Sequence, residues 1–335
     1  MKLHSLCMAT LVSVASMGVD AAGFQQIRVD DPGQGNLTVG LWYPTSEAPP
    51  SEPNTEYGLP VALNADIEDA NGGLILISHG FGGWYAGHAD TAIALADAGF
   101  IVAAPTHTGN TWSDMSSSVD QWVLDRPRHI SRVIDSVLAD EVLASHIDSA
   151  NIGVYGFSAG GLTAMSLIGA VPDMSRAKEF CAQREVEFAC DQGLVDQMLK
   201  ARMSELPKSA WGADSRIAAA VISAPGLGFA YTRESLADVV ADVQLWSGEL
   251  DDSVPTEFNA AYIADLLPNP SETHWIEKAN HFAFMTVSCR EEFKQNDPEE
   301  YSIVCGDAEG FDRYQFHNEM HQEMVRFYAE NFATE

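Results

Sequence analysis

The feature that most constrains this chain is a serine between two glycines, placed directly after a short apolar run. The run is Asn151-Ile152-Gly153-Val154-Tyr155, the motif is Gly156-Phe157-Ser158-Ala159-Gly160, and residues 162–168 have helical character. A strand, a sharp turn and a helix in this order can lift Ser158 above the edge of a sheet. Glycine suits the positions two residues to either side because so tight a turn leaves no room for Cβ atoms. The pentapeptide also occurs by chance, so its meaning depends on the rest of the chain.

Apolar runs and helical spacing alternate on both sides of this motif. Residues 73–78 and 100–104 are continuous apolar runs, typical of strands covered on both faces, and residues 91–98 between them have helical spacing. Strand, helix and strand in this order form a parallel βαβ unit. We further expect an antiparallel edge of strands at 25–30 and 37–44, a surface loop at 45–60, a helix opening at Asp125, strands at 216–222 and 239–246, and a final helix at 314–332. The sequence therefore predicts one α/β domain over residues 22–335, with a mostly parallel sheet flanked by helices.

Residues 172–212 depart from this alternation. They are charged, contain several methionines and have helical character. We interpret them as a helical cap inserted into the domain above Ser158, rather than as a second domain. Such a cap would shape the pocket in which a substrate binds.

The amino terminus has the layout of a secretory signal peptide. Met1-Lys2 precedes the uncharged, mostly apolar residues 6–18, and Val19-Asp20-Ala21-Ala22 offers small residues for cleavage. We expect cleavage after Ala21, which makes residues 1–21 the leader and the protein exported, either periplasmic or secreted. The apolar run is shorter than the ~20 residues that span a bilayer, which argues against stable membrane insertion.

The charge balance excludes several classes of partner. The chain has 18 Lys and Arg residues against 48 Asp and Glu residues, a formal net charge of -30. Nucleic acids and anionic membrane surfaces would repel such a protein. The composition is compatible with a salty environment that screens self-repulsion and equally with a highly soluble exported protein.

Four cysteines remain when the leader is removed: Cys181, Cys190, Cys289 and Cys305. An even number fits an oxidising compartment and allows three connectivities. We favour the local pairs Cys181–Cys190 and Cys289–Cys305, because each closes a short polar segment. A zinc site is the alternative, but neither C-x2-C spacing nor histidines interleaved within the two closely spaced pairs support it.

The chain also contains the two partners that a nucleophilic serine requires. A serine hydroxyl needs a base, and the base needs a carboxylate to orient it. Asp251 follows an apolar run that ends at Gly248, and His281 lies in a loop after a further short apolar run. The order Ser158, Asp251, His281 is the order of the α/β-hydrolase fold. Asp252 is the alternative acid, but the Gly-x-x-Asp-x-x-Val-Pro spacing selects Asp251; His281 could otherwise be an ordinary loop histidine.

The oxyanion formed in acyl transfer needs backbone N–H donors that are fixed in advance. The loop His79-Gly80-Phe81-Gly82 follows an apolar strand, so we expect the donors to be the N–H groups of Phe81 and Ala159. We interpret His79 as a residue that shapes this loop. Trp84 and Tyr85 follow the loop and could line the substrate pocket, although core packing explains them equally well.

Two other patterns do not predict a metal or cofactor site. His317 and His321 lie one turn apart, but Glu319 is one position late for H-E-x-x-H, and we interpret them as part of a solvated helix face. The glycines after His79 lack the Gly-Lys-Ser/Thr of a phosphate loop. We therefore expect neither a metal nor a cofactor.

Several of these motifs together resemble the exported dienelactone-hydrolase-like proteins related to the platelet-activating-factor acetylhydrolases. The similarity spans nearly the whole mature chain and rests on Leu41-Trp42-Tyr43-Pro44, Ile77-Ser78-His79-Gly80-Phe81-Gly82-Gly83, Arg126-Pro127, the Ser158 motif, residues 248–255 and Asn280-His281-Phe282. The resemblance implies an α/β-hydrolase fold with a serine triad and no metal. Dienelactone hydrolases proper use a cysteine nucleophile, so Ser158 favours ordinary carboxylic esters instead.

Three functions follow as hypotheses. The first is a serine ester hydrolase that acts on short to medium acyl esters, with a phospholipase-like or acetylhydrolase-like lipid esterase, or a phthalate-type diester hydrolase, as variants. The second is a non-catalytic binding protein on the same scaffold, against which the complete triad argues. The third is a peptidase that uses the same triad on amides.

Overall fold

The computed structural model describes residues 21–335 except 184–186, 287–288, 290 and 333–335. Nine strands form one sheet in the order β3-β1-β2-β5-β4-β6-β7-β8-β9. Strands β1 and β2 are antiparallel, as is the pair β2 and β5, whereas the pairs from β5 through β9 are parallel. The strands are β1 (Ala21–Asp31), β2 (Gly35–Thr45), β3 (Ala62–Leu63), β4 (Gly72–Ser78), β5 (Ile101–Pro105), β6 (Ile147–Phe157), β7 (Ile217–Ser223), β8 (Asp242–Gly248) and β9 (Glu272–Ile276). This confirms the mostly parallel sheet and its antiparallel part at β1 and β2, with the two-residue β3 added outside them.

The central strands divide their side chains between two cores. In β4, Leu74 and Leu76 join one apolar cluster, whereas Ile75 and Ile77 join the other, and all four are at most 1% exposed. Alternate residues of a strand point to opposite faces, so β4 has an apolar layer on each side. Burial on both faces explains why its sequence is a continuous apolar run.

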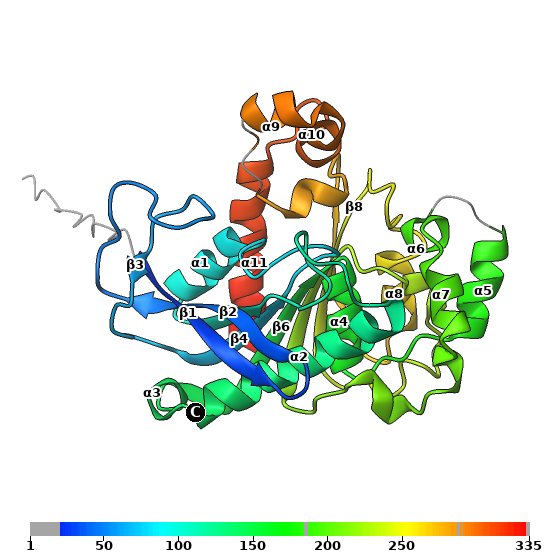
Figure 1. Ribbon diagram of the computed structural model, residues 1–335, viewed down its shortest axis with the longest axis horizontal. Coiled ribbons are helices and arrows are strands. Elements are labelled where there is room, and N and C mark those ends of the chain that lie inside the picture. Colours follow the sequence, from blue (N-terminus) through cyan, green and yellow to red (C-terminus); the bar gives the residue numbers. More distant parts are fainter. Residues whose placement is uncertain (1–20, 184–186, 287–288, 290, 333–335) are drawn as a thin grey trace, which may run out of the picture.

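Helices cover both faces of the sheet (Figure 1). The first cluster contains buried residues of α2 (Val119–Ala139) and α4 (Ala159–Leu167); the second contains those of α1 (Ala89–Asp97) and α11 (Arg313–Asn331). The remaining helices are α3 (Glu141–Ala144), α5 (Met174–Gln183), α6 (Phe188–Asp191), α7 (Leu194–Lys200), α8 (Ala260–Leu266), α9 (Glu291–Asn296) and α10 (Pro298–Cys305), with 3-10 turns η1 (Met203–Glu205), η2 (Lys208–Trp211), η3 (Gly228–Ala230) and η4 (His281–Phe284). The final helix differs from its expected bounds by one residue at each end.

Helix α2 corrects the expectation that this helix opens at Asp125. It begins at Val119, where the Gln121 side chain accepts a hydrogen bond from the backbone N–H of Ser118 at 2.9 Å. This reciprocal cap satisfies a free donor at the helix end. Pro127 lies inside the helix. Proline is common at the first position of a helix, which is why the sequence suggested that this helix begins near Asp125 and not at Val119.

The region 172–212 is helical, as expected, and α5 to α7 lie at one side of the molecule (Figure 1). Its apolar residues, among them Ala177, Met198 and Trp211, join the cluster that contains α2 and α4. The backbone N–H of Phe188 donates to the carbonyl oxygen of Ser253 at 2.9 Å. This bond ties α6 to the loop that follows β8.

Both expected disulfides are confirmed. Cys181–Cys190 joins α5 to α6, and Cys289–Cys305 joins the segment before α9 to the end of α10. The sequence indicated the cysteine pairs but not the two helices α9 and α10. The predicted leader falls on residues 1–20, outside the described part of the chain, and on Ala21. Among the described residues, no helix has the length and apolarity needed to cross a membrane.

Candidate active site

Ser158 lies in the strained turn between β6 and α4. Its φ is 55° and its ψ is -114°, a backbone conformation that is costly for a residue with a side chain. A Cβ atom at Gly156 would lie 2.1 Å from the carbonyl oxygen of Gly160, and one at Gly160 would lie 1.9 Å from the carbonyl oxygen of Ser78. The two glycines therefore serve the steric purpose expected of them, because β6, β4 and α4 meet at this turn.

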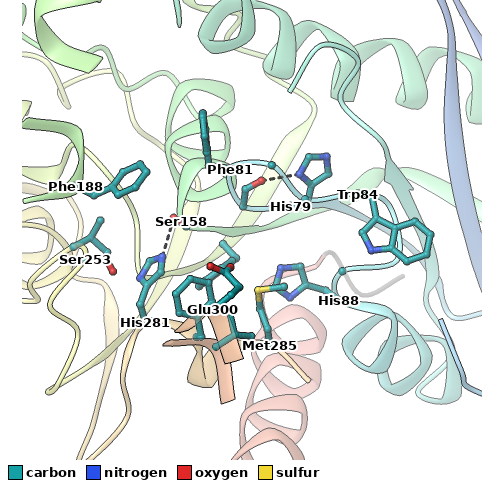
Figure 2. A pocket seen from close by; sticks show the side chains of 18 residues that line it. His79, Phe81, Trp84, His88, Ser158, Phe188, Ser253, His281, Met285 and Glu300 are labelled. Carbon is teal, nitrogen blue, oxygen red and sulfur yellow. Dashed lines mark hydrogen bonds between the residues drawn. The ribbon is translucent and has the colours of Figure 1, made fainter. Parts of the chain in front are cut away.

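The structure brings Ser158, His281 and Asp251 together from the ends of three strands. Nε2 of His281 lies 3.0 Å from Oγ of Ser158, and Nδ1 of His281 lies 2.7 Å from Oδ2 of Asp251. Ser158 follows β6, Asp251 follows β8, and His281 opens η4 after β9. This is the linear arrangement of nucleophile, base and carboxylate that acyl transfer requires. Figure 2 shows His281 directed at Ser158.

Asp251 is held rigidly by the loop that contains it. Its Oδ1 accepts the backbone N–H groups of Ser253 at 3.0 Å and Val254 at 2.8 Å, while Oδ2 faces His281. Asp251 is buried, whereas Asp252 is exposed. A buried carboxylate with charge-assisted hydrogen bonds can fix the tautomer and the orientation of its histidine.

The N–H groups of Phe81 and Ala159 have no acceptor among the described residues. Ala159 is the first residue of α4, so the positive end of the helix dipole lies at its N–H. Both residues line the space around Ser158: Phe81 borders two cavities there and Ala159 borders one. Free, ordered N–H groups beside a nucleophile are suited to bind an oxyanion.

The larger cavity beside Ser158 has a volume of about 350 Å³. Its walls are mainly apolar and include Trp84, Phe157 and Met285, with Val304 of α10 at one side. Figure 2 shows that Trp84 comes from the chain that follows the His79 loop. Tyr85 does not lie at this cavity: it packs in the core against Phe24 and Trp42, and its hydroxyl donates to Glu56. Of the two aromatic residues singled out in the sequence, the structure brings Trp84 alone to the site.

A second cavity of about 40 Å³ also reaches Ser158. Apolar side chains of α4, α7 and the loop before η3 line it, among them Leu162, Met198 and Leu227. Glu187 lines it as well, and burial followed by the charge of Asp251 raises the pKa of this carboxyl to about 7. Sequence reasoning missed Glu187, since nothing in its local sequence signals that it is buried.

Sequence reasoning also missed Arg126 as a residue of the site. Its guanidinium donates hydrogen bonds to the carbonyl oxygens of His79 and Gly80, and it is buried. Nε2 of His79 accepts the backbone N–H of His107 at 3.1 Å, and its Nδ1 donates to the carbonyl oxygen of Gly80 at 2.7 Å. His79 thus shapes the loop, as expected. In the sequence, Arg126 stands out only as part of the Arg126-Pro127 pair, and this pair does not indicate what the side chain does.

Two side-chain groups in the described residues have a composition that could hold a metal: Asp90 with His317 and His321, and Glu272 with His274 and Glu323. The expectation that His317 and His321 lie on a solvated face is wrong. Both are buried at the interface of α11 with α1, because α11 packs along its length against the sheet. Glu272 is already neutralised by an ion pair with Arg326.

Comparison with known proteins gives the fold. The sequence matches no protein-family model and no curated protein. Among solved structures, a ferulic acid esterase from Streptomyces cinnamoneus matches with a TM-score of 0.59 and 18% sequence identity, over 96% of this chain and 92% of that one. The fold is that of the α/β-hydrolases. At this identity the likeness establishes the architecture, which the sequence predicted.

Proposed function

We propose that this chain is an exported serine hydrolase that cleaves carboxylic esters. The observation that carries the proposal is the hydrogen-bonded chain from Ser158 Oγ through His281 to Asp251, with distances of 3.0 Å and 2.7 Å. Two disulfides are the basis for proposing an oxidising compartment outside the cytoplasm.

In this mechanism Oγ of Ser158 attacks the ester carbonyl carbon while Nε2 of His281 takes the hydroxyl proton. The N–H groups of Phe81 and Ala159 bind the oxyanion of the tetrahedral intermediate. The ester C–O bond then breaks, and His281 returns the proton to the departing alcohol. A water molecule, deprotonated by His281, cleaves the acyl-enzyme and releases the acid. Asp251 orients His281 and stabilises its charged form throughout.

The two cavities support a preference for a small acyl group. A volume of about 40 Å³ accommodates roughly three water-sized groups, given about 10–15 Å³ for each. We assign the acyl group to this cavity and the alcohol group to the larger, apolar one. Acetyl to butyryl esters of apolar or aromatic alcohols then fit best, and residues 172–212 act as the cap over the acyl side. A lipid esterase of the acetylhydrolase type or a diester hydrolase would use the same two cavities.

The deciding experiment compares the wild type with Ser158→Ala on p-nitrophenyl acetate, butyrate and octanoate. We expect turnover that declines from butyrate to octanoate and falls to background in the variant, with an unchanged thermal midpoint. A fluorophosphonate probe should label the wild type at Ser158. An active Ser158→Ala protein would exclude the proposed mechanism, and an unlabelled, inactive wild type would indicate a binding protein. Comparable rates on a matched anilide would indicate a peptidase.

A further inference from the structure

Helix α11 makes a direct hydrogen bond to the turn that carries His281. Nε2 of His317 lies 2.8 Å from the carbonyl oxygen of Ala283, and Nδ1 of His317 lies 2.7 Å from Oδ2 of Asp90. Ala283 belongs to η4, which begins at His281, and Asp90 belongs to the first turn of α1. His317 therefore joins a residue of α1 to the η4 turn, and α1 and α11 share one face of the sheet.

Both ring nitrogens of His317 face hydrogen-bond acceptors. A carbonyl oxygen can only accept, so Nε2 carries a hydrogen. Burial alone would raise the pKa of Asp90, but the hydrogen bond and the charge of His317 hold it well below its usual range. The other two histidines that face Asp90 are neutral at pH 7, because burial lowers the pKa of His88 and of His321 to about 4. An ionised carboxylate oxygen can only accept, so Nδ1 of His317 donates the hydrogen bond to Oδ2 of Asp90.

The distance between His317 and Asp90 decides between a proton and a metal ion. Asp90, His317 and His321 offer three ligand atoms within 4.8 Å of one another. Ligands at 2.0–2.1 Å from a tetrahedral zinc ion lie roughly 3.3 Å apart. The observed 2.7 Å between Nδ1 and Oδ2 is the length of a charge-assisted hydrogen bond instead. The distance between His317 and Asp90 therefore fits a shared proton. The two ring N–H groups of His317 are then used by Asp90 and by the carbonyl oxygen of Ala283.

We propose that His317 is a positioning residue for the catalytic base His281, with Asp90 fixing the orientation of His317. This inference rests on the proposed ester hydrolysis. The His317 bond to Ala283 anchors η4 two residues after His281, and His281 Nε2 meets Ser158 Oγ at 3.0 Å. Loss of the anchor lets the turn shift, and a shift of about 1 Å in a catalytic group lowers the rate by up to about 100-fold.

Two substitutions at His317 separate its two hydrogen bonds. The side-chain amide of Gln reaches about as far as Nε2 of histidine, so His317→Gln keeps a donor for Ala283 and loses the donor beside Asp90. The shorter His317→Asn keeps a donor near Asp90 and loses the bond to Ala283. We expect His317→Asn to lower kcat about 10- to 100-fold with KM within about 2-fold, and His317→Gln to recover most of kcat although both variants lose stability.

His321→Gln is the matched control. His321 is buried one turn further along α11, and its Nε2 lies 3.0 Å from Oγ1 of Thr91 in α1, not from the η4 turn. The His321→Gln substitution should lower the thermal midpoint but leave kcat unchanged. The rate of fluorophosphonate labelling at Ser158 should follow kcat in all variants, since labelling needs a correctly placed base.

The outcomes are distinguishable. A kcat for His317→Asn equal to that of the wild type, or an equal loss in His317→Asn, His317→Gln and His321→Gln, would overturn the positioning role. Zinc retained at one ion per chain by the wild type and lost in His321→Gln would overturn the shared proton. A wild type that hydrolyses no ester and is not labelled would instead overturn the proposed function.

Discussion

Arg126 donates hydrogen bonds to the carbonyl oxygens of His79 and Gly80, at 2.6 Å and 2.9 Å, and so fixes the two residues that precede Phe81. Arg126 is 1% exposed, and among the described residues its hydrogen-bond acceptors are the carbonyl oxygens of His79 and Gly80 and Oδ1 of Asn110, with no carboxylate in ion-pair distance. Burial lowers its pKa to about 9, so it remains charged at pH 7. A buried cation without a carboxylate is costly, and here its hydrogen bonds are directed at the loop that presents the Phe81 N–H.

Replacement of Arg126 should therefore impair the oxyanion loop. Arg126→Met removes the donor to the buried carbonyl oxygen of His79 and one of the donors to the carbonyl oxygen of Gly80, and we expect kcat to fall by at least about 10-fold, by analogy with loss of an oxyanion donor. The kcat of Arg126→Lys should lie between those of the wild type and Arg126→Met, because a lysine cannot donate to both carbonyl oxygens with the same geometry. Steady-state kinetics on p-nitrophenyl butyrate and thermal melting would measure both effects. Arg132→Met, at an exposed position of the same helix, should change neither; a kcat for Arg126→Met equal to that of the wild type would refute the role.

The acid of the proposed triad can be tested with its neighbour as control. Asp251→Asn should lower kcat about 10³- to 10⁴-fold because the amide no longer fixes the correct tautomer of His281. Asp252→Asn should stay within about 2-fold of the wild type, since Asp252 is exposed and its neighbour holds His281. The reverse result would assign the acid to Asp252.

The two disulfides should have similar effects on stability and different effects on selectivity. Each closes a short loop, of 9 and 16 residues in sequence separation, so removal of either should cost about 3 kcal/mol of unfolding free energy. Cys181–Cys190 lies beside the smaller cavity through Ala189, the neighbour of Cys190, and Cys289–Cys305 holds α10 at the larger one.

Paired Cys→Ser variants would separate these effects. Removal of Cys181–Cys190 should raise the hexanoate-to-acetate rate ratio, whereas removal of Cys289–Cys305 should change selectivity for the alcohol and leave that ratio as it is. Denaturant unfolding and an ester panel are the measurements. Identical ester profiles in both variants would contradict our assignment of acyl and alcohol groups to the two cavities.

Glu187 should make the protein less stable as the pH rises. Its pKa is about 7 in the folded protein against 4.5 when unperturbed, so the folded state binds the proton more tightly. Stability from this group is fully present below about pH 4.5 and is lost as the pH rises to about 7, a change of roughly 3 kcal/mol. Glu187→Gln should remove this loss and be more stable than the wild type at pH 8. Denaturant unfolding at pH 5 and pH 8 would test it, with the exposed Glu141→Gln as control; a pH-independent difference between wild type and Glu187→Gln would contradict the prediction.

The sequence predicted those features that have local signatures. The apolar runs of β4, β5 and β6 reflect burial on both faces, and the glycines around Ser158 reflect contacts with neighbouring backbone, so both could be recognised without coordinates. The order of serine, acid and histidine follows from the order of the strands. These features allowed the α/β-hydrolase fold and the candidate triad to be predicted together.

The features that escaped prediction depend on contacts between distant segments. Arg126 meets His79 across 47 positions, and His317 meets Asp90 across 227. A histidine on a buried helix face cannot be told from one on a solvated face when the helix pattern is as mixed as that of α11. Tyr85 likewise follows the Phe81 loop in sequence but turns into the core, because Phe24 and Trp42 offer it an aromatic surface there.

Ser158, Asp251 and His281 follow three different strands, β6, β8 and β9. Their separation along the chain determines when the proposed active site is assembled during folding. A chain that has formed only the strands up to β6 carries the nucleophile without its base or acid. The base arrives with η4, after the last strand at the edge of the sheet, and its anchor arrives with the carboxyl-terminal helix. The proposed hydrolytic activity would thus require the whole chain to have folded, and a protein exported unfolded, as we propose for this one, would cross the membrane as an inert polypeptide.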